Sequence, residues 1–579
     1  MPIPPRFTLS ERLQRTSGQH AMLLWAALAG LAGSLATIAF RDALAGLQRL
    51  LVGHSGSFVE MAASLPWQMR VVLPCAGGLL AGFFLVLTKR LADVAPPDYM
   101  DAIAVGDGKV SVAQTLLRGA SSLCTISSGG SIGREGPMVQ LAAMCASLLG
   151  RAARFDLPRL RLLVACGAAA GITSAYNAPI ASAFFVTEIV LGSIVMESVG
   201  PMMIASVVAN VTMRRFPGYK PTYEMPAFPD VPNGEVLLFA VLGVLAGFLA
   251  PQFLRLLGFA RQWFRDSGMP LPVRLGLGGL AVGILSVWVP QVWGNGYSVV
   301  NSLLHEPWLW SAVLVVLFAK AAATLFTAGS GAVGGIFTPT LFIGAALGYL
   351  FGLAMHLLWP GQTSGPAAYA IVGMGAFLAA STAAPLMAIL MIFEMTLSYQ
   401  VMLPLMLACV VAYFLARSVG GPSMYEITAH HRREQAERLR LRTMQMQELI
   451  KPAETVLHPD APLAAMFAMF SAHPVKYLYI VDEASRLLGV VPLRELAAAP
   501  AGQERRTAAD FLQPDLLPLV TPEMSLGEAY RQFLAHHGER LPVVQSLAEP
   551  VLLGVVYKTA LLEAYARLQR DEVAGLSSF

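Results

Sequence analysis

A glycine-rich loop between two apolar segments carries one arginine and one glutamate, Arg134 and Glu135. The loop reads Gly-Gly-Ser-Ile-Gly-Arg-Glu-Gly-Pro over residues 129–137. A carboxylate at membrane depth is costly, so an ionisable residue placed there is by default a functional candidate. Glu135 is therefore the first candidate for chemistry. The structural alternative is a local ion pair between Arg134 and Glu135 that caps a helix.

The composition places this loop in a membrane protein. Of the 579 residues, 55% are hydrophobic and 13% are charged, against about 25% charged in soluble domains, and the mean hydropathy is +0.59. The net charge of +4 is too small and too scattered to indicate a nucleic-acid partner. The five cysteines lie in apolar runs without CxxC spacing, which predicts neither a disulfide framework nor a metal site.

The N-terminus reads as a cytoplasmic segment, residues 1–18, rather than a cleaved signal peptide. Residues 1–19 are polar and contain proline, and the apolar run from Ala21 to Phe40 is long enough to span a bilayer. We expect a short amphipathic helix at residues 10–14. Arginines cluster near the N-terminus and again at residues 432–442, which fits cytoplasmic flanks at both ends of the membrane part.

Apolar segments then follow one another to about residue 419, and glycine interrupts them at residues 129–136 and 329–335. Broken helices survive inside a membrane only when they are buried in protein or line a cavity, because the freed backbone groups need partners. The sequence therefore predicts an all-α polytopic membrane protein with many broken, tilted helices. Its transmembrane domain would cover residues 19–425.

A repeated order of motifs divides this domain into two halves. In each half a glycine loop ending in proline precedes a glycine-rich helix, and an Ala-Pro pair then precedes a glutamate. The spacing is nine residues both times, from Pro179 to Glu188 and from Pro385 to Glu394. Chance in a Gly- and Ala-rich background is the alternative explanation. The pattern favours an inverted repeat, with halves at about 70–213 and 235–420, whose glycine loops face each other near the midplane.

The composition changes after residue 419. Residues 426–452 carry dense charge at helical spacing and predict a solvated linker helix. Two similar βαββα units follow, at residues 453–499 and 507–570, and we expect them to pack against each other as an α+β pair.

Three ordered motifs resemble those of the CLC family of chloride channels and proton-coupled anion transporters. They are Gly133-Arg-Glu-Gly-Pro137, Gly335-Ile-Phe-Thr-Pro339 and Ser423-Met-Tyr425. The tail resembles a tandem pair of CBS domains. The sequence Pro97-Asp-Tyr-Met-Asp-Ala102 makes the chain most similar to the bacterial ClcB-type branch of the family.

The resemblance implies transport of chloride or a related inorganic anion such as nitrate, by a homodimer in the bacterial inner membrane with one pathway per subunit. Glu135 would be the external gate, whose carboxylate competes with the anion. Glycine loops at helix N-termini expose backbone N–H groups that hold an anion without a full positive charge. The implied anion-binding residues are Gly133, Arg134, Gly136, Ile336, Phe337 and Tyr425, together with Val94.

Two departures from the family pattern bear on the mechanism. The first anion loop carries Val94 or, in a shifted register, Pro97 where the family has a serine, so no hydroxyl is supplied there and anion selectivity stays open. Ile189 stands where proton-exchanging members commonly carry an internal glutamate. Glu188 fits the family's structural glutamate, although it or water could carry protons in place of the missing residue. Channel-like conduction is the leading hypothesis, and chloride/proton antiport is the alternative.

The tail and the polar residues suggest two further readings. The CBS pair could bind an adenine nucleotide, but the ribose-binding aspartate is not intact: Glu495 stands in the first unit and Ala560 in the second. We favour a structural role for the pair and expect no other cofactor. A membrane-tethered nucleotide sensor is the alternative of another class. No paired carboxylate, His-Glu metal spacing or nucleophile motif predicts an enzyme.

Overall fold

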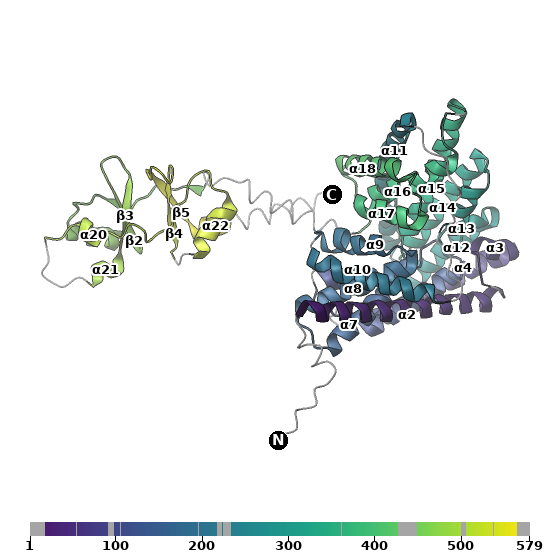
Figure 1. Ribbon diagram of the computed structural model, residues 1–579. Coiled ribbons are helices and arrows are strands. Elements are labelled where there is room, and N and C mark those ends of the chain that lie inside the picture. Colours follow the sequence, from purple (N-terminus) through teal and green to yellow (C-terminus); the bar gives the residue numbers. More distant parts are fainter. Residues whose placement is uncertain are drawn as a thin grey trace, which may run out of the picture. The chain divides into compact units, whose positions relative to one another are not determined.

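The chain folds into two compact units, residues 1–429 and 430–579 (Figure 1). The computed structural model describes residues 18–53, 55–90, 98–104, 106–194, 196–216, 223, 233–360, 362–425, 449–498, 505–535 and 538–563. The helix expected at residues 10–14, most of the linker helix, Val94 and Pro97 lie outside these residues.

The first unit is entirely helical in its described part. Its first half contains α2 (Gly18–Val52), α3 (Phe58–Ser64), α4 (Trp67–Arg90), α5 (Tyr99–Ala104), α6 (Val112–Ser127), α7 (Glu135–Ala152), α8 (Leu157–Tyr176), α9 (Pro179–Phe185), the π-helix η1 (Val186–Leu191) and α10 (Met196–Arg214). Its second half contains α11 (Val236–Asp266), α12 (Leu271–Trp288), α13 (Tyr297–His305), α14 (Trp310–Gly329), α15 (Phe337–Leu358), α16 (Pro366–Thr382), α17 (Pro385–Thr396) and α18 (Met402–Ser418), with the short 3-10 turns η2 (Asn233–Glu235) and η3 (Pro290–Val292).

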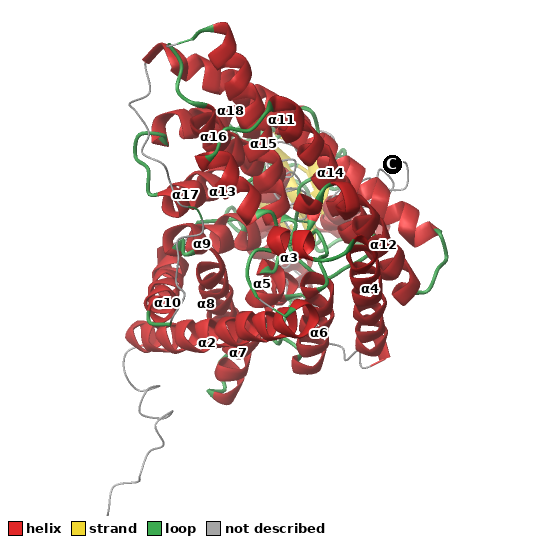
Figure 2. Ribbon diagram, turned by 90° about the vertical axis from the view of Figure 1, so that its right-hand side faces the viewer, coloured by secondary structure: helices red, strands yellow, loops and turns green. Residues whose placement is uncertain are grey.

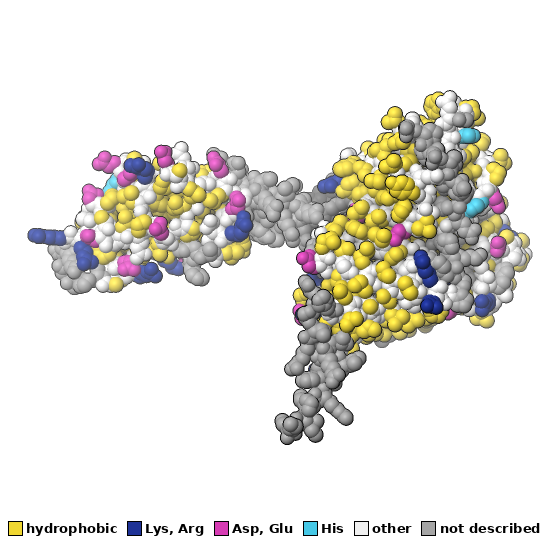
Figure 3. Space-filling view, viewed as in Figure 1, with side chains coloured by type: hydrophobic (Ala, Val, Ile, Leu, Met, Phe, Trp, Pro, Cys, Tyr) yellow, Lys and Arg dark blue, Asp and Glu magenta, His cyan; other side chains and the backbone are white. Residues whose placement is uncertain are grey.

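Six helices of the described chain are long and apolar enough to cross a membrane: α2, α4, α11, α12, α14 and α15. Hydrophobic side chains cover most of the visible face of this unit, and charged side chains are isolated on it (Figure 3). These observations confirm a multi-pass membrane protein. The other described helices of this unit lie among these six (Figure 2).

The two halves repeat the same order of elements, as the motif spacing predicts. A glycine loop precedes α7 in one half and α15 in the other, and each of these helices packs on the next, α8 or α16. Both α8 and α16 end on a residue with left-handed backbone, Asn177 and Ala383, each with φ 59°. An Ala-Pro pair then starts α9 and α17. The matching backbone angles support a true repeat over chance.

The halves hold each other together through the two repeat-related glutamates. The carboxylate of Glu394 accepts hydrogen bonds from the backbone N–H groups of Ile180 (3.0 Å) and Ala181 (2.7 Å) at the start of α9. The carboxylate of Glu188 accepts them in the same way at the start of α17, where the shorter bond, to the N–H of Met387, is 2.7 Å. Helices α9 and α17 lie side by side (Figures 1 and 2). Each half thus supplies the N-terminal cap that the other lacks.

The second unit contains two similar α+β repeats, which confirms the predicted tandem domains. The first consists of β1 (Val456–Leu457), α20 (Leu463–Ala472), β2 (Tyr477–Val481), β3 (Leu487–Pro492) and α21 (Leu493–Ala497); η5 (Ala508–Phe511) follows, and the second contains α22 (Leu526–Ala535), β4 (Arg540–Val544) and β5 (Leu552–Tyr557). Strands β2 and β3 pair antiparallel, as do β4 and β5. Arg540 of the second repeat donates to Thr455 Oγ1 (2.7 Å) and to the carbonyl oxygen of Tyr477 (2.8 Å) in the first, so the repeats pack together.

Replacing either capping glutamate should destabilise the membrane unit. We expect Glu188→Ala and Glu394→Ala each to cost about 1.5–3 kcal/mol, because two backbone N–H groups lose a charged acceptor away from water. The apparent melting temperature in detergent measures the effect. The exposed Glu197, in the first turn of α10, provides the control Glu197→Ala, which should melt like the wild type. Equal melting temperatures for all three variants would show that the caps contribute nothing.

Candidate functional site

The two glycine loops meet and pair with each other, as expected from the repeat. The N–H of Gly133 donates to the carbonyl oxygen of Gly335 (2.8 Å), and the N–H of Gly335 donates to the carbonyl oxygen of Gly133 (2.9 Å). Helix α7 begins two residues after Gly133, and α15 begins two residues after Gly335. The bridge therefore brings together the N-termini of two helices that begin 202 residues apart in sequence, at Glu135 and Phe337.

Helix α14 anchors the first loop from the other half. The hydroxyl of Thr327 accepts the N–H of Ser131 (3.2 Å), and the hydroxyls of Ser131 and Thr324 lie 3.2 Å apart. Because α14 leads directly into the second loop, both loops are positioned by one segment of chain. This arrangement explains how glycine-rich backbone keeps a defined shape at this depth.

Glu135 is the first residue of α7, and its side chain is only 4% exposed. Its Oε1 accepts hydrogen bonds from Thr338 Oγ1 (2.6 Å) and from the hydroxyl of Tyr297 (3.3 Å). Its Oε2 is buried without a hydrogen-bond partner in the described structure. The described residues contain no ion pair between Arg134 and Glu135, so the local helix-capping alternative is wrong. The carboxylate is instead held by hydroxyl groups from the second half.

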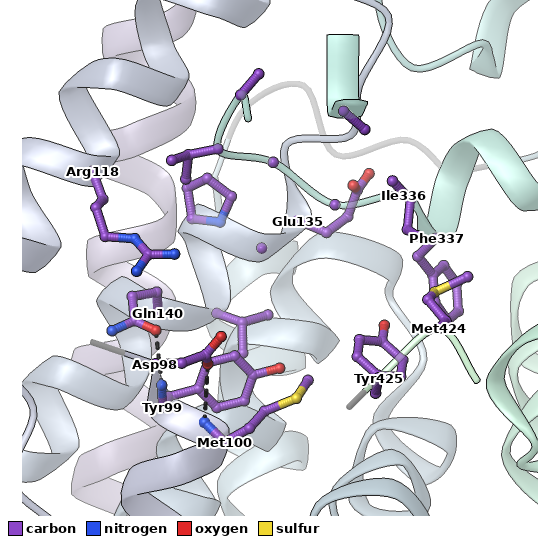
Figure 4. A pocket seen from close by; sticks show the side chains of 18 of the residues that line it. Asp98, Tyr99, Met100, Arg118, Glu135, Gln140, Ile336, Phe337, Met424 and Tyr425 are labelled. Atoms are coloured by element: carbon purple, nitrogen blue, oxygen red, sulfur yellow. Dashed lines mark hydrogen bonds between the residues drawn. The ribbon is translucent and has the colours of Figure 1, made fainter. Parts of the chain in front are cut away.

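A cavity of about 330 Å³ opens beside Glu135. Of the predicted anion-binding residues, four line it with Glu135: Gly136, Ile336, Phe337 and Tyr425. Figure 4 shows Glu135 and the start of α15 on one side of this space and Tyr425 below them. Gly133 and Arg134 are not among its lining residues; Gly133 serves the backbone bridge instead.

The chemistry of this cavity suits a small anion. The first-turn N–H groups of α7 and α15 have no intrahelical acceptor, and the helix dipoles add partial positive charge at both N-termini. Arg118 and Arg261 also line the cavity and contribute two full positive charges, against the carboxylates of Asp98 and Glu135. An anion could therefore replace the Glu135 carboxylate between the two helix ends without a metal or cofactor.

Several residues around Glu135 and its cavity were not predicted from the sequence. Thr338 lies inside the second glycine motif and could have been found there, because a hydroxyl beside a helix N-terminus is a natural carboxylate partner. Tyr297 is 162 residues from Glu135, whereas Arg118 lies within α6 and Arg261 in the C-terminal part of α11. No local pattern marks these three, and only the folded chain brings them together.

Two other predicted residues lie outside this cavity. The carboxylate of Glu188 accepts a backbone N–H group at the start of α17, and the neighbouring Ile189 is fully buried. In the second unit, Glu495 Oε1 accepts a hydrogen bond from Gln513 Nε2 (3.2 Å). The proton role of Glu188 and the nucleotide role of Glu495 stay predictions.

Comparison with known proteins agrees with this geometry. A family model described as voltage gated chloride channel matches residues 77–417, more than half of the chain. The chain belongs to the CLC chloride channel family. A second model, the CBS domain, matches residues 447–502 and 509–567. The CLC match covers both glycine loops and both capping glutamates. It confirms the resemblance to the CLC family that three short motifs indicated.

The similarity to individual CLC proteins is extensive. A ClcB-like chloride channel protein from Ralstonia nicotianae is 56% identical over 423 residues, which are 72% of this chain and 99% of the relative. The voltage-gated ClC-type chloride channel ClcB of Escherichia coli is 40% identical over 418 residues, 71% of this chain and 99% of the relative. Among solved structures, a slow cyanobacterial Cl⁻/H⁺ antiporter superposes with a TM-score of 0.63 at 28% identity, over 72% of this chain and 99% of its own.

A side chain at Gly133 should disturb the loop pair. In Gly133→Ala the added Cβ would overlap Glu135 Oε2 and lie 2.9 Å from the carbonyl oxygen of Gly335, so the bridge or the carboxylate must move. We expect a loss of roughly 1–3 kcal/mol, measured as a lower apparent melting temperature. Gly136→Ala is the matched control, because its nearest contact would be 3.5 Å away. A Gly133→Ala protein that melts no lower than this control would contradict the role of the bridge.

Proposed function

We propose that this chain transports chloride or a related inorganic anion such as nitrate through a pathway of its own, gated by the Glu135 carboxylate. Conduction would be channel-like and dependent on pH or voltage. The anion would lie in the cavity beside the N-termini of α7 and α15, where Gly136, Ile336, Phe337 and Tyr425 contribute backbone and hydroxyl donors. Binding mainly through backbone and hydroxyl donors would be moderate in strength, which allows the rapid release that conduction requires.

The observation that carries this proposal is the position of the Glu135 carboxylate. It lies at the junction of the two halves, where its Oε1 accepts hydrogen bonds from Thr338 Oγ1 (2.6 Å) and the hydroxyl of Tyr297 (3.3 Å). A carboxylate and a halide carry the same charge and compete for the same N–H and O–H groups. Displacement or protonation of Glu135 would therefore open this position to the transported anion.

Obligatory exchange of chloride for protons is the alternative. The similar solved structure, titled a Cl⁻/H⁺ antiporter, favours it. Two features of this chain favour channel-like conduction. Ile189 cannot titrate, and both oxygens of Glu188 accept backbone N–H groups, which ties its carboxylate to the start of α17.

We further propose that the protein is a homodimer of the bacterial inner membrane with cytoplasmic termini. Its bacterial relatives and the basic flanks of the membrane part support this placement. The second unit would then lie on the cytoplasmic side, in a structural role.

Flux measurements test the function and separate its two mechanisms. Purified protein in liposomes loaded with potassium chloride should release chloride into low-chloride buffer when valinomycin is added, and external pH is recorded in parallel. We expect chloride efflux without sustained proton movement. Proton uptake in a fixed ratio to chloride efflux would establish the exchanger, and the absence of any anion flux would overturn the proposal.

Two substitutions test the gating role: one removes the charge of Glu135, and the other removes the hydroxyl of Thr338 that donates to it. Glu135→Gln should conduct at neutral pH with no remaining pH dependence. Thr338→Val removes the 2.6 Å hydrogen bond, so we expect flux at neutral pH to rise by on the order of tenfold while the pH dependence persists. The control is Thr340→Val, since Thr340 Oγ1 donates only within its own helix, to the carbonyl oxygen of Phe337. Wild-type flux and pH dependence in Glu135→Gln would contradict the gating role.

A further inference from the structure

Two tyrosines line the same cavity below Glu135. Tyr99 is the first residue of α5 and is 6% exposed, whereas Tyr425 follows α18 and is half-buried. In the close view the hydroxyl of Tyr99 points across the cavity toward Tyr425, and the hydroxyl of Tyr425 points up toward Glu135 (Figure 4). Neither hydroxyl has a hydrogen-bond partner among the described residues, and both are open to the cavity.

Such a pair of hydroxyls is available to a ligand. Both are open to the cavity, and each phenol O–H can donate one hydrogen bond to an acceptor that enters it. The nearby carboxylate of Asp98 accepts the N–H of Met100 at its Oδ1 (3.0 Å) and has no hydrogen bond with either hydroxyl in the described structure. A small anion in the cavity would satisfy both hydroxyls at once.

The position of Tyr99 is fixed by the helix that carries the gate. The backbone N–H of Tyr99 donates to Gln140 Oε1 (3.0 Å), and Gln140 lies five residues after Glu135 on α7. Gln140 Nε2 in turn donates to Thr115 Oγ1 (3.3 Å) on α6. Tyr99 is therefore held in one place before any ligand enters, which lowers the cost of binding.

We infer that the Tyr99 hydroxyl donates a hydrogen bond to the transported anion, opposite Tyr425, and that this pair determines anion preference. The inference rests on the proposed transport function and names a ligand that the motifs did not predict. Neutral hydroxyl donors replace only part of an anion's hydration shell. The site should therefore bind weakly hydrated anions such as nitrate better than strongly hydrated ones such as fluoride.

Anion titration of the purified full-length protein tests this assignment. Tyr99→Phe keeps the ring and removes the hydroxyl, so we expect chloride affinity by calorimetry to fall by about tenfold, and the preference for nitrate over fluoride in liposome flux to shrink. Tyr425→Phe should have a similar effect. The control is Tyr349→Phe, because the Tyr349 hydroxyl accepts a hydrogen bond from the N–H of Trp308 and does not line the cavity. Its chloride affinity should equal that of the wild type.

Each outcome decides the inference. Unchanged chloride affinity and selectivity in a folded Tyr99→Phe protein overturns it, while wild-type flux in the same liposomes shows that the transport proposal still stands. Loss of all wild-type flux would instead contradict the proposed function. Should Tyr99→Phe fail to fold, Gln140→Leu removes the acceptor for the Tyr99 N–H and should weaken chloride binding by a smaller factor. Wild-type affinity in that variant would also overturn the inference.

Discussion

Backbone N–H groups at the ends of broken helices must find acceptors inside the membrane, and the rest of this structure depends on how they do so. Each half of the chain supplies acceptors to the other. Glu394 and Glu188 accept the first N–H groups of α9 and α17, and Gly133 and Gly335 exchange a pair of backbone hydrogen bonds. Neither half could be stable alone in lipid, because its helix ends would remain unpaired.

The same reciprocity creates the functional cavity. Pairing the two glycine loops brings the N-termini of α7 and α15 together, and Gly136, Ile336 and Phe337 at these helix ends line the cavity. The Glu135 carboxylate lies there, on one half, and its hydrogen-bond donor Thr338 lies on the other. A carboxylate held between the halves is stabilised by both, and for the same reason an anion that takes its place would be stabilised by both.

The folded protein changes what the two departures from the family motifs mean for the site. The sequence offers no hydroxyl at Val94 or Pro97, yet α5 directs the hydroxyl of its first residue, Tyr99, into the cavity beside Glu135. The side chain of Glu188 is engaged by backbone rather than lying in the cavity. A side chain that is missing at one sequence position therefore need not be missing from the site, because a residue on a neighbouring element can present a similar group.

The sequence by itself determined the membrane class, the two halves and the glycine loops, and it marked Glu135 as a candidate, because hydrophobic runs, glycine breaks and the repeated Pro-to-Glu spacing are local patterns. It also predicted the pair of α+β units in the tail. Only the tertiary structure decided which groups surround Glu135. Tyr297 and Thr338 lie 162 and 203 residues away, and contacts over such distances depend on how helices pack, which no local pattern records.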